Sequence, residues 1–149
     1  MAIVKQVVGT KAALTVTGLS TLASATYAVS AVKDNTTNQP LDLLVELSAT
    51  VGVVATPFAA YLFAKASLDN VNYGSGPESG TTATDEPDLV FIGAVPANTS
   101  SIAHTRQFSV ASQFAGVLPP YLKFVVKNST GAAFTAGTLS VSEVSSTVV

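Results

Sequence analysis

Cysteine and tryptophan are absent from the sequence, and histidine occurs once, as His104. The absence of cysteine excludes disulfide bonds and thiolate metal sites, but it leaves the redox compartment undecided. A zinc site with one histidine would need carboxylates for its other ligands, which is uncommon. Without tryptophan, a sugar-binding platform would have to be built from other rings. The sequence therefore predicts no metal centre and no cofactor.

Charged residues are also scarce. They make up 11% of the 149 residues, less than half the usual quarter, and the net charge is −2. No cluster of Lys and Arg alternates with aromatic residues, so the charge pattern of a nucleic-acid-binding protein is missing. A surface rich in Ser, Thr, Ala and Val with few charges indicates a protein that neighbouring molecules partly cover.

One long stretch, Ala12–Val32, carries no charge at all. Its length would allow a membrane-spanning helix, and the triplet Ala23–Ala25 has the form of a signal-peptidase site. Ser and Thr interrupt the apolar residues throughout, and the β-branched content favours strands. We therefore expect two strands, LTVT and TYAVSAV, joined by a turn around Gly18, and neither a signal peptide nor a transmembrane segment.

Apolar and polar residues alternate along LDLLVELSAT, which places Leu41, Leu43, Val45 and Leu47 on one face of a strand. Other strand candidates follow, with turn signals between most of them: Phe58–Ser67, Leu89–Val95, His104–Val110, Tyr121–Asn128 and Thr138–Val144. About eight strands without an amphipathic helix predict an all-β fold. We expect a single β-sandwich domain over residues 1–149, jelly-roll-like, with a terminal arm at residues 1–11.

Residues 68–88 are dense in Gly, Pro, Asn, Asp and Ser, which predicts a long surface loop. It holds five of the nine acidic residues: Asp69, Glu78, Asp85, Glu86 and Asp88. Such oxygen ligands suit calcium, but the EF-hand spacing is absent, so a solvated acidic loop is the preferred interpretation.

The start of this loop offers a candidate surface contact. Asp69, Asn70, Asn72 and Tyr73 combine directional hydrogen-bonding groups with a ring face, as a small carbohydrate-contacting patch would. The same residues are typical of an Asn/Asp turn anchored by Tyr73, and we prefer that interpretation.

No arrangement of residues predicts catalysis. His104 is two residues from Arg106 on a strand-like segment, so it lacks an obvious carboxylate to orient it as a base. The glycines of YGSGPESG match neither a phosphate-binding loop nor a dinucleotide fingerprint, and no G-x-S-x-G elbow occurs. We expect that the protein is not an enzyme.

Four phrases between Leu22 and Phe134 resemble small virion structural proteins of tailed bacteriophages: LASATYAVSAVKDNTTNQPLDLLVEL, AYLFAKASLDNVNYG, DLVFIGAVPANTSS and FSVASQFAGVLPPYLKFVVKNSTGAAF. The resemblance is closest to β-sandwich proteins that decorate or cement the capsid. It implies a virion protein assembled in the bacterial host cytoplasm, with the major capsid protein and copies of itself as partners, as a dimer or trimer. It implies no catalytic residues.

The terminal segment IVKQVV is the candidate interface, because its apolar residues lie on both faces of a strand: Ile3 and Val7 on one, Val4 and Val8 on the other. An exposed strand of this kind is an aggregation hazard, so we expect it to pair with a neighbouring subunit. Pairing within its own sheet is the alternative.

Three other functions stay open: a tail, collar or fibre component, a carbohydrate-binding surface module, and, last, a small hydrolase.

Overall fold

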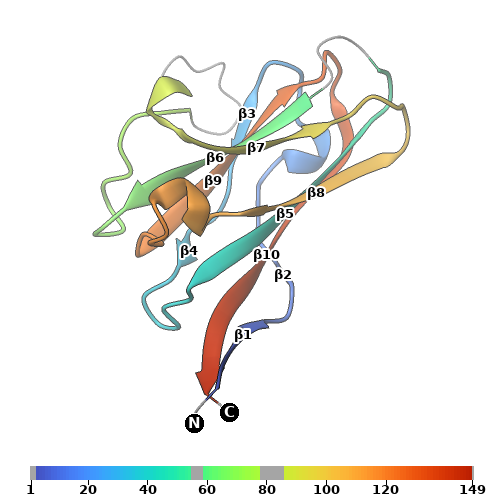
Figure 1. The fold of residues 1–149 in the computed structure, drawn as a ribbon. Coiled ribbons are helices and arrows are strands. Elements are labelled where there is room, and N and C mark those ends of the chain that lie inside the picture. Colours follow the sequence, from blue (N-terminus) through green and yellow to red (C-terminus); the bar gives the residue numbers. More distant parts are fainter. Residues whose placement is uncertain (1–2, 55–58, 78–85, 149) are drawn as a thin grey trace.

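The computed structural model describes residues 3–54, 59–77 and 86–148, which form ten β-strands and three short 3-10 helices (Figure 1). The strands are β1 (Val4–Val8), β2 (Ala12–Ala13), β3 (Tyr27–Val29), β4 (Lys33–Asp34), β5 (Asp42–Val51), β6 (Ala59–Ser67), β7 (Val90–Pro96), β8 (Ala103–Ser109), β9 (Tyr121–Ser129) and β10 (Phe134–Val148). The helices are η1 (Leu19–Thr21), η2 (Glu86–Asp88) and η3 (Ala111–Phe114).

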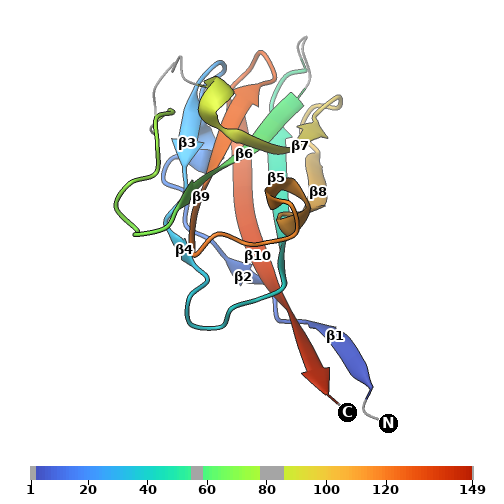
Figure 2. The same ribbon diagram turned by 60° about the vertical axis from the view of Figure 1, so that its left-hand side comes forward.

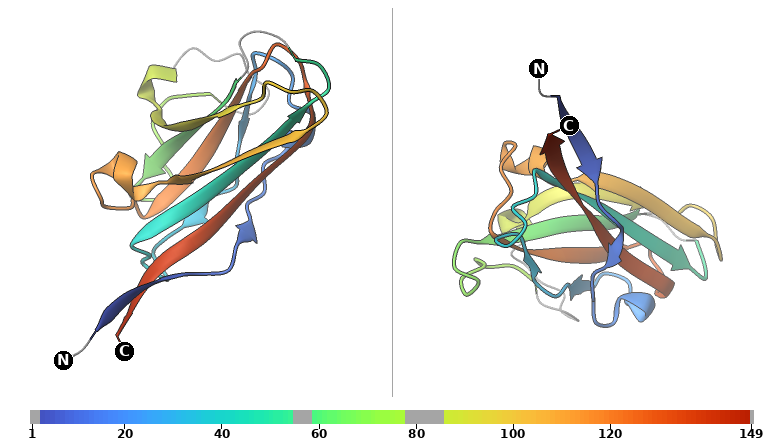
Figure 3. Two further views of the ribbon diagram at one scale, coloured as in Figure 1. Left: turned by 45° about the vertical axis from the view of Figure 1, so that its right-hand side comes forward. Right: turned by 90° about the horizontal axis from the view of Figure 1, so that it is seen from below.

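The strands form two antiparallel sheets that pack face to face, so the predicted β-sandwich is confirmed (Figure 3). The first sheet has the order β1-β10-β5-β8, with β2 also paired to β10. The second has the order β3-β9-β6-β7, with β4 also paired to β9. The chain crosses between sheets after β2, β4, β5, β7, β8 and β9, so its connections gather at the two ends of the sandwich. We call the end at which β5 and β9 begin the terminal end.

The core between the sheets follows the alternation seen in the sequence. Leu43, Val45 and Leu47 of β5 are fully buried, as are Leu122 and Phe124 of β9. This agreement is expected, because successive side chains of a strand point to opposite faces. The sequence interpretation was wrong at its first position: Leu41 precedes β5 and is 49% exposed.

The uncharged stretch from residue 12 to 32 contributes β2, η1 and β3 rather than one continuous element. The predicted strand LTVT was wrong: β2 ends at Ala13, and within LTVT only an isolated bridge joins Val16 to Ser30. Leu19 and Leu22 are buried in the core. No helix within the three described ranges is long and apolar enough to cross a membrane.

A buried amide fixes the end of the sandwich opposite the terminal end. Asn128 of β9 is fully buried, and its side-chain Nδ2 donates to the carbonyl oxygens of Leu22 at 2.8 Å and Ala132 at 2.7 Å. Its Oδ1 accepts hydrogen bonds from the backbone N–H and the hydroxyl of Thr130. All four of these bonds compensate the cost of burying the amide.

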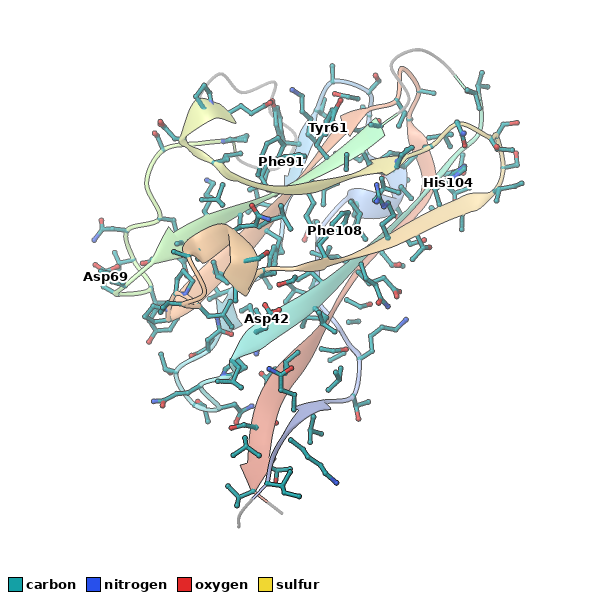
Figure 4. All side chains as sticks on the ribbon, viewed as in Figure 1. Asp42, Tyr61, Asp69, Phe91, His104 and Phe108 are labelled. Atoms are coloured by element: carbon teal, nitrogen blue, oxygen red, sulfur yellow. The ribbon has the colours of Figure 1, made fainter. Side chains whose placement is uncertain are left out.

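The two sheets approach each other at one side through β7 and β8. The ring of Phe108 on β8 lies against Gly93 on β7, so that a Cβ built on Gly93 would stand 2.2 Å from a ring carbon (Figure 4). Only a residue without a side chain allows this approach. The guanidinium of Arg106 lies 5.8 Å from the centre of the same ring.

Candidate interaction surface

The first strand and the end of the last strand form a two-stranded ribbon. Val4 pairs with Val148 and Val8 with Val144, in a continuous antiparallel register. Pairing between β10 and β5 ends at Val144, opposite Asp42. The ribbon, defined as residues 4–8 and 144–148, therefore extends beyond the body of the sandwich (Figure 2).

The apolar side chains of this ribbon are largely uncovered, except that of Val144, which is buried, and the preceding residue Ile3 is exposed as well. Every β1 residue is exposed, and the exposed fractions are 58% for Ile3, 66% for Val4, 44% for Val7, 56% for Val8 and 69% for Val148. A two-stranded ribbon is at best marginally stable in water by itself, and exposed apolar strand edges favour association. The ribbon is therefore the most conspicuous candidate contact surface in the described part of the chain.

β1 pairs with β10 of its own chain, which is the alternative of pairing within its own sheet. The expectation that Ile3, Val4, Val7 and Val8 contact a neighbouring subunit stays a prediction. Their exposure leaves both faces of the strand available for such a contact.

Charged and polar groups hold the base of the ribbon. The Lys33 ammonium donates to Glu143 Oε1 at 2.5 Å, and Asn38 Nδ2 donates to Glu143 Oε2 at 2.8 Å. The hydrogen bond from Lys33, followed by that from Asn38, outweighs burial and lowers the pKa of Glu143. The backbone N–H of Leu41 donates to Val144 O at 2.7 Å. These bonds fix the direction in which the ribbon leaves the sandwich.

An apolar groove opens at the same end of the sandwich. It consists of two pockets of about 550 and 380 Å³, which share Val117, Leu118 and Pro120 as walls. Leu68 lines the first pocket and Leu41 the second, and Val117 is 73% exposed. We call this surface the terminal groove. Sequence analysis missed it, because its residues come from three loops and none has a periodic pattern.

Asp42 positions one wall of the terminal groove. Its Oδ1 accepts hydrogen bonds from the backbone N–H groups of Leu43 at 2.7 Å and Ala111 at 2.7 Å, and its Oδ2 accepts from Ser109 Oγ at 2.6 Å. The carboxylate thus ties the start of β5 to η3, just before the Val117–Pro120 segment (Figure 4).

The predicted contact residue Asp69 stabilises a turn. Its Oδ1 accepts hydrogen bonds from the backbone N–H groups of Asn72 at 2.8 Å and Val71 at 2.9 Å, and from the hydroxyl of Ser67 at 2.9 Å. Its Oδ2 accepts from Asn72 Nδ2 at 2.6 Å. The hydrogen bonds from Asn72 and Val71 hold the pKa of Asp69 well below its usual range. Both carboxylate oxygens are therefore engaged within the loop.

Asn70 and Tyr73 complete the same turn. The Tyr73 hydroxyl donates to Asn70 Oδ1 at 2.6 Å, and the Lys123 ammonium lies 4.4 Å from the centre of the Tyr73 ring. This arrangement is the Asn/Asp turn anchored by Tyr73 that the sequence favoured. Carbohydrate contact by these residues stays a prediction.

The described acidic residues of the 68–88 loop are held by specific partners. Glu86 accepts hydrogen bonds from Lys127 and from the hydroxyl of Tyr27. Burial raises the pKa of Glu86, but these two hydrogen bonds outweigh it and the net pKa is lowered. Ser75 donates to Asp88. Glu78 and Asp85 lie outside the described residues.

His104 of β8 has a partner in the loop that precedes the strand. Its Nε2 lies 2.9 Å from the carbonyl oxygen of Thr99, next to the start of β8 (Figure 4). Within the described ranges, no three His, Asp or Glu side chains gather closely enough to hold a metal ion.

The outer face of the second sheet carries an aromatic cluster that sequence analysis did not single out. Phe63 and Phe91 meet edge to face with ring centres 5.6 Å apart, and Tyr61 lies 6.3 Å from Phe91. Phe91 is about half exposed. The ribbon, the terminal groove and this cluster are thus three apolar surfaces of the described chain.

No model of a known protein family matches the chain, and no curated protein matches it.

Proposed function

We propose that this chain is a structural protein of a bacteriophage virion, most specifically a decoration or cement protein of the capsid. In this proposal it binds across joints between copies of the major capsid protein through the terminal end. The observation that carries the proposal is the ribbon, whose apolar side chains on both faces extend from the sandwich into solvent. The sequence resemblance supports the same class of protein.

The strand order also supports the proposal. Counting β1 with β2 as one interrupted strand, and β3 with β4 as another, gives eight strands in two sheets of four. In this count the first sheet has the order 1-8-3-6 and the second 2-7-4-5, and this order supports the jelly roll that the sequence predicts. Jelly rolls occur in viral capsid proteins and in lectins, so this support is an analogy at the level of the fold.

The energetics of attachment follow from exposed apolar area. Fully burying a Val or Ile side chain contributes about 1.5–3 kcal/mol, and Ile3 together with Val4, Val7, Val8 and Val148 of the ribbon are each roughly half exposed or more. Covering them would contribute on the order of 5 kcal/mol per copy before the costs of association. A contact of this size is weak for a single copy and becomes strong when copies joined in one oligomer bind the shell together.

The test uses virions of the encoding phage that lack this chain, mixed with purified protein and sedimented. Val4→Asp should abolish co-sedimentation, because it places a charge in the buried contact. Val53→Asp is the matched control, since Val53 is 67% exposed against 66% for Val4 but lies in the β5–β6 connection at the opposite end. Equal binding by both variants, or equal loss, would refute attachment through the ribbon.

A density map of the native particle decides between the virion functions. Many symmetric copies on the shell would support decoration. A few copies at the tail or collar would show a tail, collar or fibre component instead. Binding to a glycan array that Tyr73→Ala abolishes would favour the carbohydrate-binding alternative.

A further inference from the structure

The outer edge of β1 has free backbone groups in a defined pattern. The N–H of Gly9 donates to Glu143 O at 2.8 Å, so Gly9 and the alternate residues Val7 and Lys5 direct their backbone groups toward β10. Val4, Gln6 and Val8 must then direct their N–H and C=O groups away from β10. In the described part of the chain no strand pairs with this edge.

The edge lacks the devices that normally prevent strand pairing. Its register with β10 is continuous, without a bulge, and Val4–Val8 contains no proline and one charge, Lys5. Natural edge strands are blunted by bulges, prolines or charged side chains, and of these β1 has only the single charge of Lys5. This edge is therefore suited to accept another strand.

We propose that β1 pairs antiparallel with β1 of a second copy of this chain, about a two-fold axis at Gln6. In this register Val4 lies opposite Val8 of the second copy, and Gln6 lies opposite Gln6. All three residues with outward backbone groups are then hydrogen-bonded. A shift of two residues leaves one of them unpaired, and a shift of one residue sets outward groups against inward ones.

The side chains favour the same pairing. The outer valines Val4 and Val8 meet their counterparts on the face that also carries Val144 and Val148 of β10. Lys5 lies opposite Val7 of the second copy, so the only charged residue of the strand does not face its own equivalent. Cross-strand apolar pairs stabilise a sheet and directly opposed like charges destabilise it. This self-complementarity is why the occupant is a second copy of the chain.

The pairing would join the first sheets of two copies into one continuous sheet. The inference rests on the proposed function in one respect, since it takes the ribbon to be a contact surface. It assigns the edge of the ribbon to a second copy and leaves the valine faces and the terminal groove for the shell. A strand supplied by another protein would be a different occupant, and the test separates the two.

The first test measures the molar mass of the purified protein by light scattering at micromolar concentration. The wild-type chain should be a dimer. Gln6→Pro should be a monomer, because proline removes an outward N–H without removing a bond to β10. Ser146→Pro is the matched control: Ser146 pairs with Gln6, so its N–H faces the other edge of the ribbon, and this variant should stay dimeric.

The second test uses the absence of cysteine from the chain. In the proposed register the Cα atoms of the two Gln6 residues are about 5.5 Å apart, within the range of a disulfide. The two Val4 residues are four positions out of register, or roughly 13 Å apart. Mild oxidation should therefore cross-link Gln6→Cys at least tenfold more than Val4→Cys.

A monomeric wild-type protein, a dimer that survives Gln6→Pro, or equal cross-linking of the two cysteine variants would each overturn the inference. If Gln6→Pro fails to fold, the cysteine pair still decides. Monomers that attach to virions would refute this inference and leave the proposed function intact. Dimers that do not attach to virions would support this inference and refute the proposed function.

Discussion

Removal of residues 1–8 tests whether the ribbon serves the fold or an interface. We expect the truncated protein to keep its sandwich and to lose attachment to virions. The reason is that β1 contributes little net free energy to folding, although it supplies a large part of the exposed apolar surface of the ribbon.

The magnitude follows from the contacts of β1. Ile3, Val4, Val7 and Val8 keep between 44% and 66% of their surface exposed, so their burial contributes about half of its full value, or roughly 4 kcal/mol together. The hydrogen-bonded pairs of Lys5 and Val7 with β10 add about 1 kcal/mol per bond, or roughly 4 kcal/mol. Ordering six residues costs about 1–2 kcal/mol each, which nearly cancels this gain. The free energy of unfolding should therefore change by no more than about 2 kcal/mol.

The assay combines thermal unfolding, followed by far-ultraviolet circular dichroism, with co-sedimentation on virions that lack the chain. A change of about 2 kcal/mol corresponds to a shift of roughly 4–8 °C in the melting temperature of a domain of this size. A much larger shift, or loss of the β-sheet signal, would show that β1 belongs to the folding core. Unchanged attachment would show that the ribbon is not the contact surface.

Three further outcomes are expected from melting temperatures. Gly93→Ala should cost about 1–3 kcal/mol, because its Cβ would overlap the Phe108 ring, whereas Gly52→Ala meets only a flexible methyl group and should change stability little. Asn128→Ala should cost about 2–4 kcal/mol, since it removes four hydrogen bonds from a buried site, including the one that the Thr130 backbone N–H donates to Asn128 Oδ1. The pKa of Glu143 is lowered from 4.5 by its hydrogen bond from Lys33, so its stabilisation is present above pH 4.5 and is lost as the pH falls through the lowered pKa. Glu143→Gln should therefore lose less stability than wild type on acidification, and equal losses would contradict this assignment.

The sequence by itself determined the class of fold and most of the long strands. Alternation in β5 and β9 predicted which side chains are buried, because the pleat of a strand converts a period of two into an inside and an outside. The turn around Asp69 could also be predicted from the sequence, since its hydrogen bonds are made within a few residues along the chain.

Tertiary structure decided what depends on distant partners. Local pattern could not show that Leu41 would lie outside the core, because its position is set by where β5 begins to pair with β10. Nor could it predict ten strands in place of about eight. The short strands β2 and β4 are separate elements because each pairs with β10 or β9 at only two positions.

The candidate contact surface shows the same division between local and distant determinants. The sequence marked Ile3–Val8 as a strand with two apolar faces, because that property is local. Its pairing with Val144–Val148 of the same chain, and the meeting of three loops in the terminal groove, join residues far apart in sequence. Such contacts depend on the path of the whole chain through both sheets, and a local pattern of side chains does not predict that path.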